Sequence, residues 1–140
     1  MWLTDAPSDS RVDYARDGEA WTTIFAPAAV TRHVAVIGDL ASGERYRYRV
    51  FSGGVPFGVE STFRAPRSSL ETRFRFGVIG DTNGVDVPSR IAERLAESDV
   101  DFVLHTGDVV YPSGEQKDYD AQFFLPFSRW LREGPVLPTF

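Results

Sequence analysis

Two apolar runs that each lead to the dipeptide Gly-Asp constrain this 140-residue sequence more than any other feature. The first run, residues 74–79, leads to Asp81, and the second, residues 100–105, leads to Asp108. Residues 89–98 between them place apolar side chains four positions apart, which indicates a helix. The order strand, helix, strand predicts neighbouring parallel strands with both aspartates at their carboxyl ends, where ligands bind in open α/β sheets. Because two carboxylates repel each other there, the pattern favours a bound hard cation with oxygen ligands.

Charge and composition exclude several kinds of partner. The formal net charge of −5 argues against nucleic acid or an anionic membrane as the main partner. The sequence contains no cysteine, which excludes disulfides and thiolate metal sites. No apolar run approaches the ~20 residues that a membrane-spanning helix needs. The sequence therefore predicts a globular chain with neither a nucleic-acid nor a membrane partner, and it leaves the oligomeric state open.

Residues 1–66 have the pattern of an all-β region. Short runs of strand-forming residues are separated by turn dipeptides such as Gly53-Gly54. Several short strands with regular turns favour a β-sandwich. Residues 65–69 are the best candidate for a linker. The strands are expected at residues 2–4, 11–14, 21–25, 33–37, 46–51 and 61–64, with a turn over residues 5–10.

Residues 67–140 are predicted to begin an α/β domain. Pro88 suits the first turn of the central helix, and Asp86 stands where it would cap that helix. Two further elements are expected: a helix in two pieces over residues 116–130, broken near Pro126, and the start of a third strand over residues 134–140.

The two acidic motifs also carry a resemblance to a known superfamily. Gly80-Asp81 and Gly107-Asp108-Val109-Val110-Tyr111 resemble the first two metal-binding motifs of the calcineurin-like metallophosphoesterases. The Asp-x-x-Tyr spacing is similar to that of the purple acid phosphatases. The resemblance implies that Asp81 binds a ferric ion, that Asp108 bridges two metals and that Tyr111 binds the ferric ion as a phenolate. It implies Fe³⁺ with Zn²⁺, Mn²⁺ or Fe²⁺ as cofactors, and no catalytic residue beyond these metal ligands.

A second resemblance concerns the first part of the chain. The stretch Leu40–Tyr46 resembles the tyrosine-corner segment of fibronectin type III domains, which precede the catalytic domain in many purple acid phosphatases. The resemblance implies a fold in two parts. An incomplete all-β fibronectin type III-like sandwich over residues 1–66 would be followed by the first part of an α/β metallophosphoesterase domain over residues 67–140.

The resemblance implies hydrolysis of phosphate monoesters, that is acid phosphatase activity, by a dinuclear metal centre in a full-length parent that is secreted or periplasmic. The family completes that centre with further, histidine-rich motifs, and this sequence has only two histidines. The chain is therefore expected to be a fragment that is inactive alone. Two alternatives stay open: a phosphodiesterase or nucleotidase of the same superfamily, and a non-catalytic β-sandwich binding fragment.

Nearby polar residues are assigned supporting or structural roles. Asn83 stands where many metallophosphoesterases have a histidine, and we interpret it as a loop residue whose amide could hydrogen-bond a water. His105 is expected to support the ligands by hydrogen bonding rather than to bind a metal. Asp39 belongs to a third Gly-Asp pair, which we interpret as a turn. His33 is expected to be an ordinary surface residue.

Overall fold

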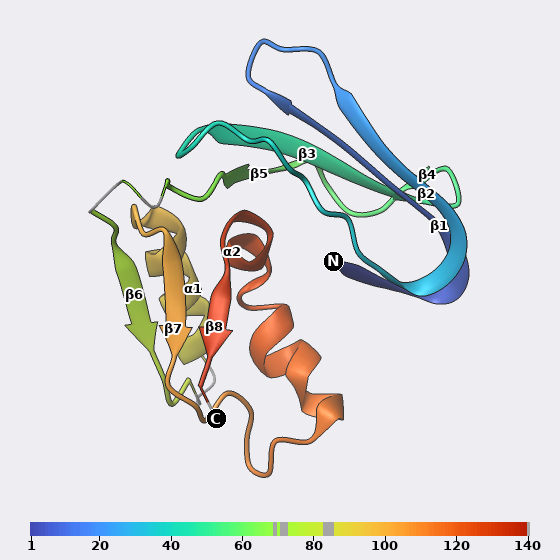
Figure 1. Cartoon of the computed structure of the whole chain (residues 1–140). Coiled ribbons are helices and arrows are strands. Elements are labelled where there is room, and N and C mark those ends of the chain that lie inside the picture. Colours follow the sequence, from blue (N-terminus) through green and yellow to red (C-terminus); the bar gives the residue numbers. More distant parts are fainter. Residues whose placement is uncertain (69, 71–72, 83–85, 140) are drawn as a thin grey trace. The chain divides into compact units, whose positions relative to one another are not determined.

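The computed structural model describes residues 1–68, 70, 73–82 and 86–139, and it is mostly β, with two sheets (Figure 1). The chain divides into two compact units, Met1–Pro66 and Arg67–Phe140. The division falls in the stretch that the sequence predicts as a linker. The first unit holds a five-stranded antiparallel sheet and the second a three-stranded parallel sheet. No helix of the described residues has the length and apolar character needed to cross a membrane.

The first unit is built on two long strands and three shorter ones. The strands pair in the order β2-β1-β3-β4, and β5 pairs with β3. The hairpin between β3 and β4 turns at Gly53-Gly54, as predicted, and both glycines have positive φ. The strands are β1 (Trp2–Arg16), β2 (Thr22–His33), β3 (Arg45–Ser52), β4 (Val55–Pro56) and β5 (Ser61–Arg64).

Two expectations about the long strands are wrong. The turn predicted over residues 5–10 is not formed, because β1 continues through these residues. The pairing of β1 with β2 shifts in register on either side of Ser8. The strand predicted over residues 33–37 is also absent, since β2 ends at His33. The pair formed by Trp2 and His33 is the last one between β1 and β2.

The described residues of the first unit form a single sheet, so the predicted two-sheet sandwich is not confirmed. A hydrogen bond does form within the stretch that resembles a tyrosine corner. The backbone N–H of Ala41 donates to the Tyr46 hydroxyl at 3.0 Å. Tyr46 is buried, and its ring stacks on Phe63 with 5.7 Å between centroids. This hydrogen bond anchors the irregular stretch before β3 onto the sheet.

The expectation that His33 lies on the surface is wrong. Its side chain is fully buried and stacks on Trp2, with 4.7 Å between ring centroids. Its Nδ1 lies 2.7 Å from the Ser10 hydroxyl, and its Nε2 lies 2.9 Å from the Thr4 hydroxyl. Both polar partners come from β1, so the imidazole links the end of β2 to the part of β1 that contains the register shifts.

The second unit has the predicted order of strand, helix, strand. Its strands β6, β7 and β8 are parallel neighbours in that order, and α1 connects β6 to β7. Pro88 lies in the first turn of α1, as expected, but Asp86 at the N-cap makes no capping bond with its side chain. The elements are β6 (Phe76–Ile79), α1 (Val87–Glu97), β7 (Phe102–His105), α2 (Ser128–Glu133) and β8 (Val136–Pro138).

The aromatic-rich stretch before α2 is less regular than predicted. A 3₁₀ turn over Gln116–Asp118 and a π-helical turn over Asp120–Phe124 replace the first helical piece. In the π turn the N–H of Leu125 donates to the carbonyl of Asp120, five residues back. The predicted break near Pro126 is confirmed, because proline has no N–H to continue the ladder and α2 begins only at Ser128.

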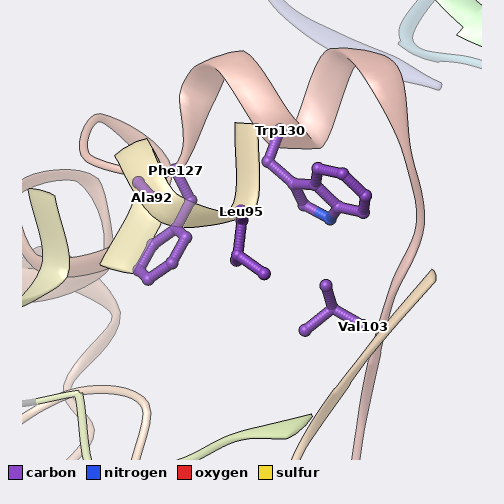
Figure 2. Close-up of a cluster of buried hydrophobic side chains, with 5 residues drawn as sticks. All are labelled: Ala92, Leu95, Val103, Phe127 and Trp130. Carbon is purple, nitrogen blue, oxygen red and sulfur yellow. The ribbon is translucent and has the colours of Figure 1, made fainter. Parts of the chain in front are cut away.

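The core of the second unit joins both α-helices to the middle strand (Figure 2). Gly77 in β6 lets α1 approach the sheet, since a Cβ there would lie 3.3 Å from a Leu95 methyl. The buried side chains are Ala92 and Leu95 from α1, Val103 from β7, Phe127 from the turn before α2, and Trp130 from α2. The packing of these residues holds α1 against the sheet.

Candidate metal centre

The loops that carry Asp81 and Asp108 leave the sheet next to each other. Ile79 pairs with His105 at the ends of parallel strands β6 and β7. Beyond that pair, the N–H of Thr106 donates to the Ile79 carbonyl at 2.8 Å, and the N–H of Asp81 donates to the Gly107 carbonyl at 3.3 Å. Backbone hydrogen bonds therefore continue past the strands and fix the spacing of the two loops.

Both aspartates have a left-handed backbone, with φ of 55° at Asp81 and 51° at Asp108. Residues other than glycine rarely adopt this conformation, although aspartate tolerates it better than most. Such strain is concentrated at ligand clamps and active sites. Asp39 in the first unit has a φ of 56°, however, so the conformation alone does not mark a metal ligand.

Tyr111 meets both aspartates through its phenol. Its hydroxyl donates a hydrogen bond to Oδ1 of Asp81. That bond raises the pKa of Tyr111 most, and burial of the hydroxyl and the negative charge of Asp108 raise the pKa further. The structure thus gathers the three side chains that the sequence singles out. Their role as metal ligands stays a prediction.

The backbone of Tyr111 is held by a residue that sequence analysis missed. Gln122 accepts a hydrogen bond from the Tyr111 N–H at 2.8 Å and donates one to the Tyr111 carbonyl, also at 2.8 Å. Gln122 lies in the π-helical turn, eleven residues along the chain. No motif marks it, because its partners are backbone groups that any residue would supply.

His105 lies between the two loops rather than at their tips. It is fully buried, and its Nδ1 accepts from the Gly107 N–H at 3.3 Å. Its Nε2 lies 3.4 Å from the hydroxyl of Thr82. Thr82 is also buried, and sequence analysis did not single it out. Burial lowers the pKa of His105, which favours the neutral ring that these contacts require. Asn83 lies outside the described residues.

The gathered donors fit one hard cation. Two carboxylates and a phenol offer only oxygen atoms, which Fe³⁺, Mn²⁺ and similar ions accept. A positive ion would also relieve the repulsion between the carboxylates and lower the phenol pKa. Among the described residues, no group of three or more His, Cys, Asp and Glu side chains could hold a metal. The donor set therefore does not amount to a complete site for two metals.

A cavity of about 620 Å³ opens beside Asp108 and Tyr111. Asp108 and Tyr111 form part of its wall, so the candidate metal position and the cavity are continuous. Tyr119, Phe123 and Leu131, from the helical segment that follows the second acidic motif, also line it. The volume lies in the range of small-molecule binding sites.

Comparison with known proteins gives a likeness in fold. No protein-family model matches the sequence, and no curated protein matches it either. Among solved structures, one described as "Structure of PhoD" aligns with 98% of this chain at a TM-score of 0.58 and 11% sequence identity. The alignment covers 33% of the PhoD chain, so this chain spans about a third of that length. At this identity the likeness shows a shared fold.

Proposed function

We propose that this chain contributes part of the dinuclear metal site of a phosphoesterase that hydrolyses phosphate monoesters. The observation that carries the proposal is the convergence of Asp81, Asp108 and Tyr111 at the carboxyl ends of parallel strands β6 and β7. The likeness to PhoD supports a phosphoesterase-related fold. In this proposal residues 67–140 belong to a metallophosphoesterase domain, and residues 1–66 are a fibronectin type III-like domain before it.

Each of the three residues has a distinct task. Asp81 would hold Fe³⁺ through its carboxylate, Asp108 would hold Fe³⁺ together with a divalent Zn²⁺, Mn²⁺ or Fe²⁺ ion, and Tyr111 would bind Fe³⁺ as a phenolate after losing its hydroxyl proton. When bound, the metals would supply an activated water and positive charge to neutralise the phosphate. In the overall reaction the water oxygen joins phosphorus, the ester P–O bond breaks, and the alcohol leaves with a proton.

The chain alone is proposed to be a poor phosphatase. It offers three of the ligands that the resemblance implies, and it spans about a third of the PhoD chain. The second metal would have little beyond Asp108 to hold it, so water activation and phosphate binding could not both occur. The parent is proposed to be secreted or periplasmic, as family resemblance implies.

Metal binding tests the proposal directly. We expect the purified chain to bind Fe³⁺ with a visible phenolate-to-iron absorption band, and Asp108→Asn to weaken binding. Tyr111→Phe should remove the band, because phenylalanine has no oxygen to bind iron. Asp39→Asn is the matched control, since Asp39 also follows glycine and has a left-handed φ of 56°. Equal weakening by Asp39→Asn, or no effect of Asp108→Asn, would contradict the proposal.

Activity measurements complete the test. With Fe³⁺ and Zn²⁺ or Mn²⁺ added, we expect little turnover of p-nitrophenyl phosphate at mildly acidic pH. Turnover in the usual enzyme range of ~1–10³ per second, lost in Asp108→Ala, would show that the site in this chain is complete rather than partial.

A further inference from the structure

The cavity beside the ligands has a composition that selects among phosphate esters. Among the described residues that line it, none is a lysine or an arginine, and Asp108 is its one carboxylate. Away from the candidate metal position, a second anionic group on the substrate would find no lysine or arginine to pair with in this described lining. A second phosphate or a carboxylate on the alcohol would therefore lose hydration without gaining an ion pair.

Most polar groups in the wall already have partners. The Thr139 hydroxyl donates to the His105 carbonyl at 3.1 Å, and the Ser113 hydroxyl donates to Glu115 at 3.1 Å. Both ring nitrogens of His105 are occupied by Gly107 and Thr82. A sugar-like or glycerol-like alcohol would give up hydrogen bonds with water and find few replacements, which costs free energy.

The rest of the wall is mostly apolar. Its apolar part is formed by the Tyr119 ring and Phe123 before α2, by Leu131 in α2, and by Val136 and Pro138 in β8, and the Tyr119 hydroxyl adds a polar group. Tyr119, Phe123, Leu131 and Val136 are partly buried, so these side chains are packed into the second unit. An apolar ring or branched alkyl group placed there would gain about 25 cal/mol for each Å² that it removes from water.

We propose that this cavity receives the alcohol portion of the substrate, and that the preferred substrates are phosphate monoesters of bulky apolar or aromatic alcohols. This inference rests on the proposed function, because Asp108 and Tyr111 belong to both the metal position and the cavity wall. Phosphate would bind at the ligands while the alcohol occupies the space between Tyr119 and Leu131. Selection comes from the chain's own apolar wall and from the absence of a cation in the described lining.

The first test needs no metal. We expect 1-naphthol, a neutral aromatic alcohol, to shift the NMR signals of the Leu131 and Val136 methyl groups and of the Tyr119 ring in the intact chain. Shifts confined to other parts of the chain, or no shifts at millimolar naphthol, would overturn the proposal. This measurement on the unsubstituted chain holds even if a cavity variant fails to fold.

The second test compares two monoesters with the same charge on phosphate. In the chain loaded with Fe³⁺ alone, 1-naphthyl phosphate should bind at least about tenfold more tightly than glycerol phosphate by calorimetry, equivalent to about 1.4 kcal/mol. Tyr119→Ala should reduce that ratio towards one. Leu125→Ala is the control, because Leu125 is 70% exposed and does not line the cavity.

The outcomes separate the two proposals. Equal binding of the two esters would overturn the inference about the alcohol while leaving the metal site in place. If naphthol binds in the cavity but the chain does not bind Fe³⁺, the proposed function fails and the ester class fails with it. A ratio that Leu125→Ala lowers as much as Tyr119→Ala would also overturn the assignment of the cavity.

Discussion

The side chain of Gln122 holds the backbone of Tyr111 with both ends of its amide, at 2.8 Å on each side. Only one orientation of the amide satisfies this pairing, because the Tyr111 N–H needs an acceptor and its carbonyl needs a donor. The π-helical turn that carries Gln122 thus fixes where the Tyr111 phenol meets Asp81. Gln122 is not one of the candidate metal ligands, but it therefore contributes to the geometry of the site.

Replacement of Gln122 by leucine should weaken iron binding without removing a ligand. Loss of an outer partner of a metal ligand typically costs about 10–100-fold in affinity. We expect the phenolate-to-iron band to persist in Gln122→Leu but to appear at higher Fe³⁺ concentrations. Gln116→Leu, at an exposed position in the preceding 3₁₀ turn, is the control. An unchanged iron titration in Gln122→Leu would show that Tyr111 is positioned without this amide.

The first unit contains a buried charge whose effect on stability depends on pH. Asp13 is 1% exposed and accepts hydrogen bonds from Arg11, Arg49 and Thr23. Burial alone would raise the pKa of Asp13, but the hydrogen bonds from Arg11 and Thr23 and the two positive charges lower it below its ordinary value. The ionised form is therefore more stable in the folded unit than in the unfolded chain.

Because the folded pKa is depressed, the contribution of Asp13 is complete above the unfolded pKa of about 3.9 and disappears as pH falls through the folded value. At neutral pH, Asp13→Asn should lower the free energy of unfolding of the first unit by about 1.5–3 kcal/mol. That difference should shrink on acidification to about pH 3. Denaturation followed through amide signals of β1 and β3 measures it, with the exposed Asp5→Asn as control. A difference that stays constant across this range would exclude a role for the ionised carboxylate.

A close packing contact sets the end of α2. A Cβ added to Gly134 would lie 2.7 Å from Cζ2 of the buried Trp130 ring, so an alanine there requires the indole to move. Overpacking of this kind usually costs about 1–3 kcal/mol. We expect Gly134→Ala to lower the denaturation midpoint of the second unit. Gly38→Ala, with nothing within 4 Å of the added Cβ, should leave stability nearly unchanged. Equal stability of the two variants would mean that the core absorbs the methyl group.

The sequence predicts the parts of this molecule that local pattern controls. The parallel strands β6 and β7, helix α1 and the placement of both aspartates follow from apolar runs, helical spacing and Gly-Asp stops. The hydrogen bond from Ala41 to Tyr46 lies within the short stretch that carries the tyrosine-corner resemblance. In these places the pattern within each element is enough to determine its structure.

Sequence patterns failed where distant partners decide the outcome. β1 continues through a stretch of turn-forming residues because it pairs with β2. His33 is buried because Trp2, Thr4 and Ser10, all more than twenty residues away, surround it. Gln122 reaches Tyr111 only because the chain folds back after the second acidic motif. None of these partners can be identified from residue type alone.

His105 offers the sharpest test of how the two acidic loops are held together. The ring accepts from Gly107, one residue before Asp108, and contacts Thr82, one residue after Asp81. Asparagine can place an acceptor near the position of Nδ1, and glutamine can place a polar atom near that of Nε2. The two variants therefore each retain one of the contacts and lose the other.

We expect His105→Asn to preserve the Gly107 amide signal while shifting that of Thr82, and His105→Gln to do the reverse. His105→Leu loses both contacts, so it should weaken Fe³⁺ binding by about 10–100-fold and lower the stability of the second unit by about 1–3 kcal/mol. Isothermal titration with iron and denaturation measure the two effects separately, and the Asp39→Asn chain gives the baseline. If His105→Leu unfolds the second unit, the asparagine and glutamine variants still distinguish the two loops. Iron affinity that stays unchanged in all three folded variants would show that Asp81 and Asp108 are positioned by the backbone bonds of Thr106 and Gly107 alone.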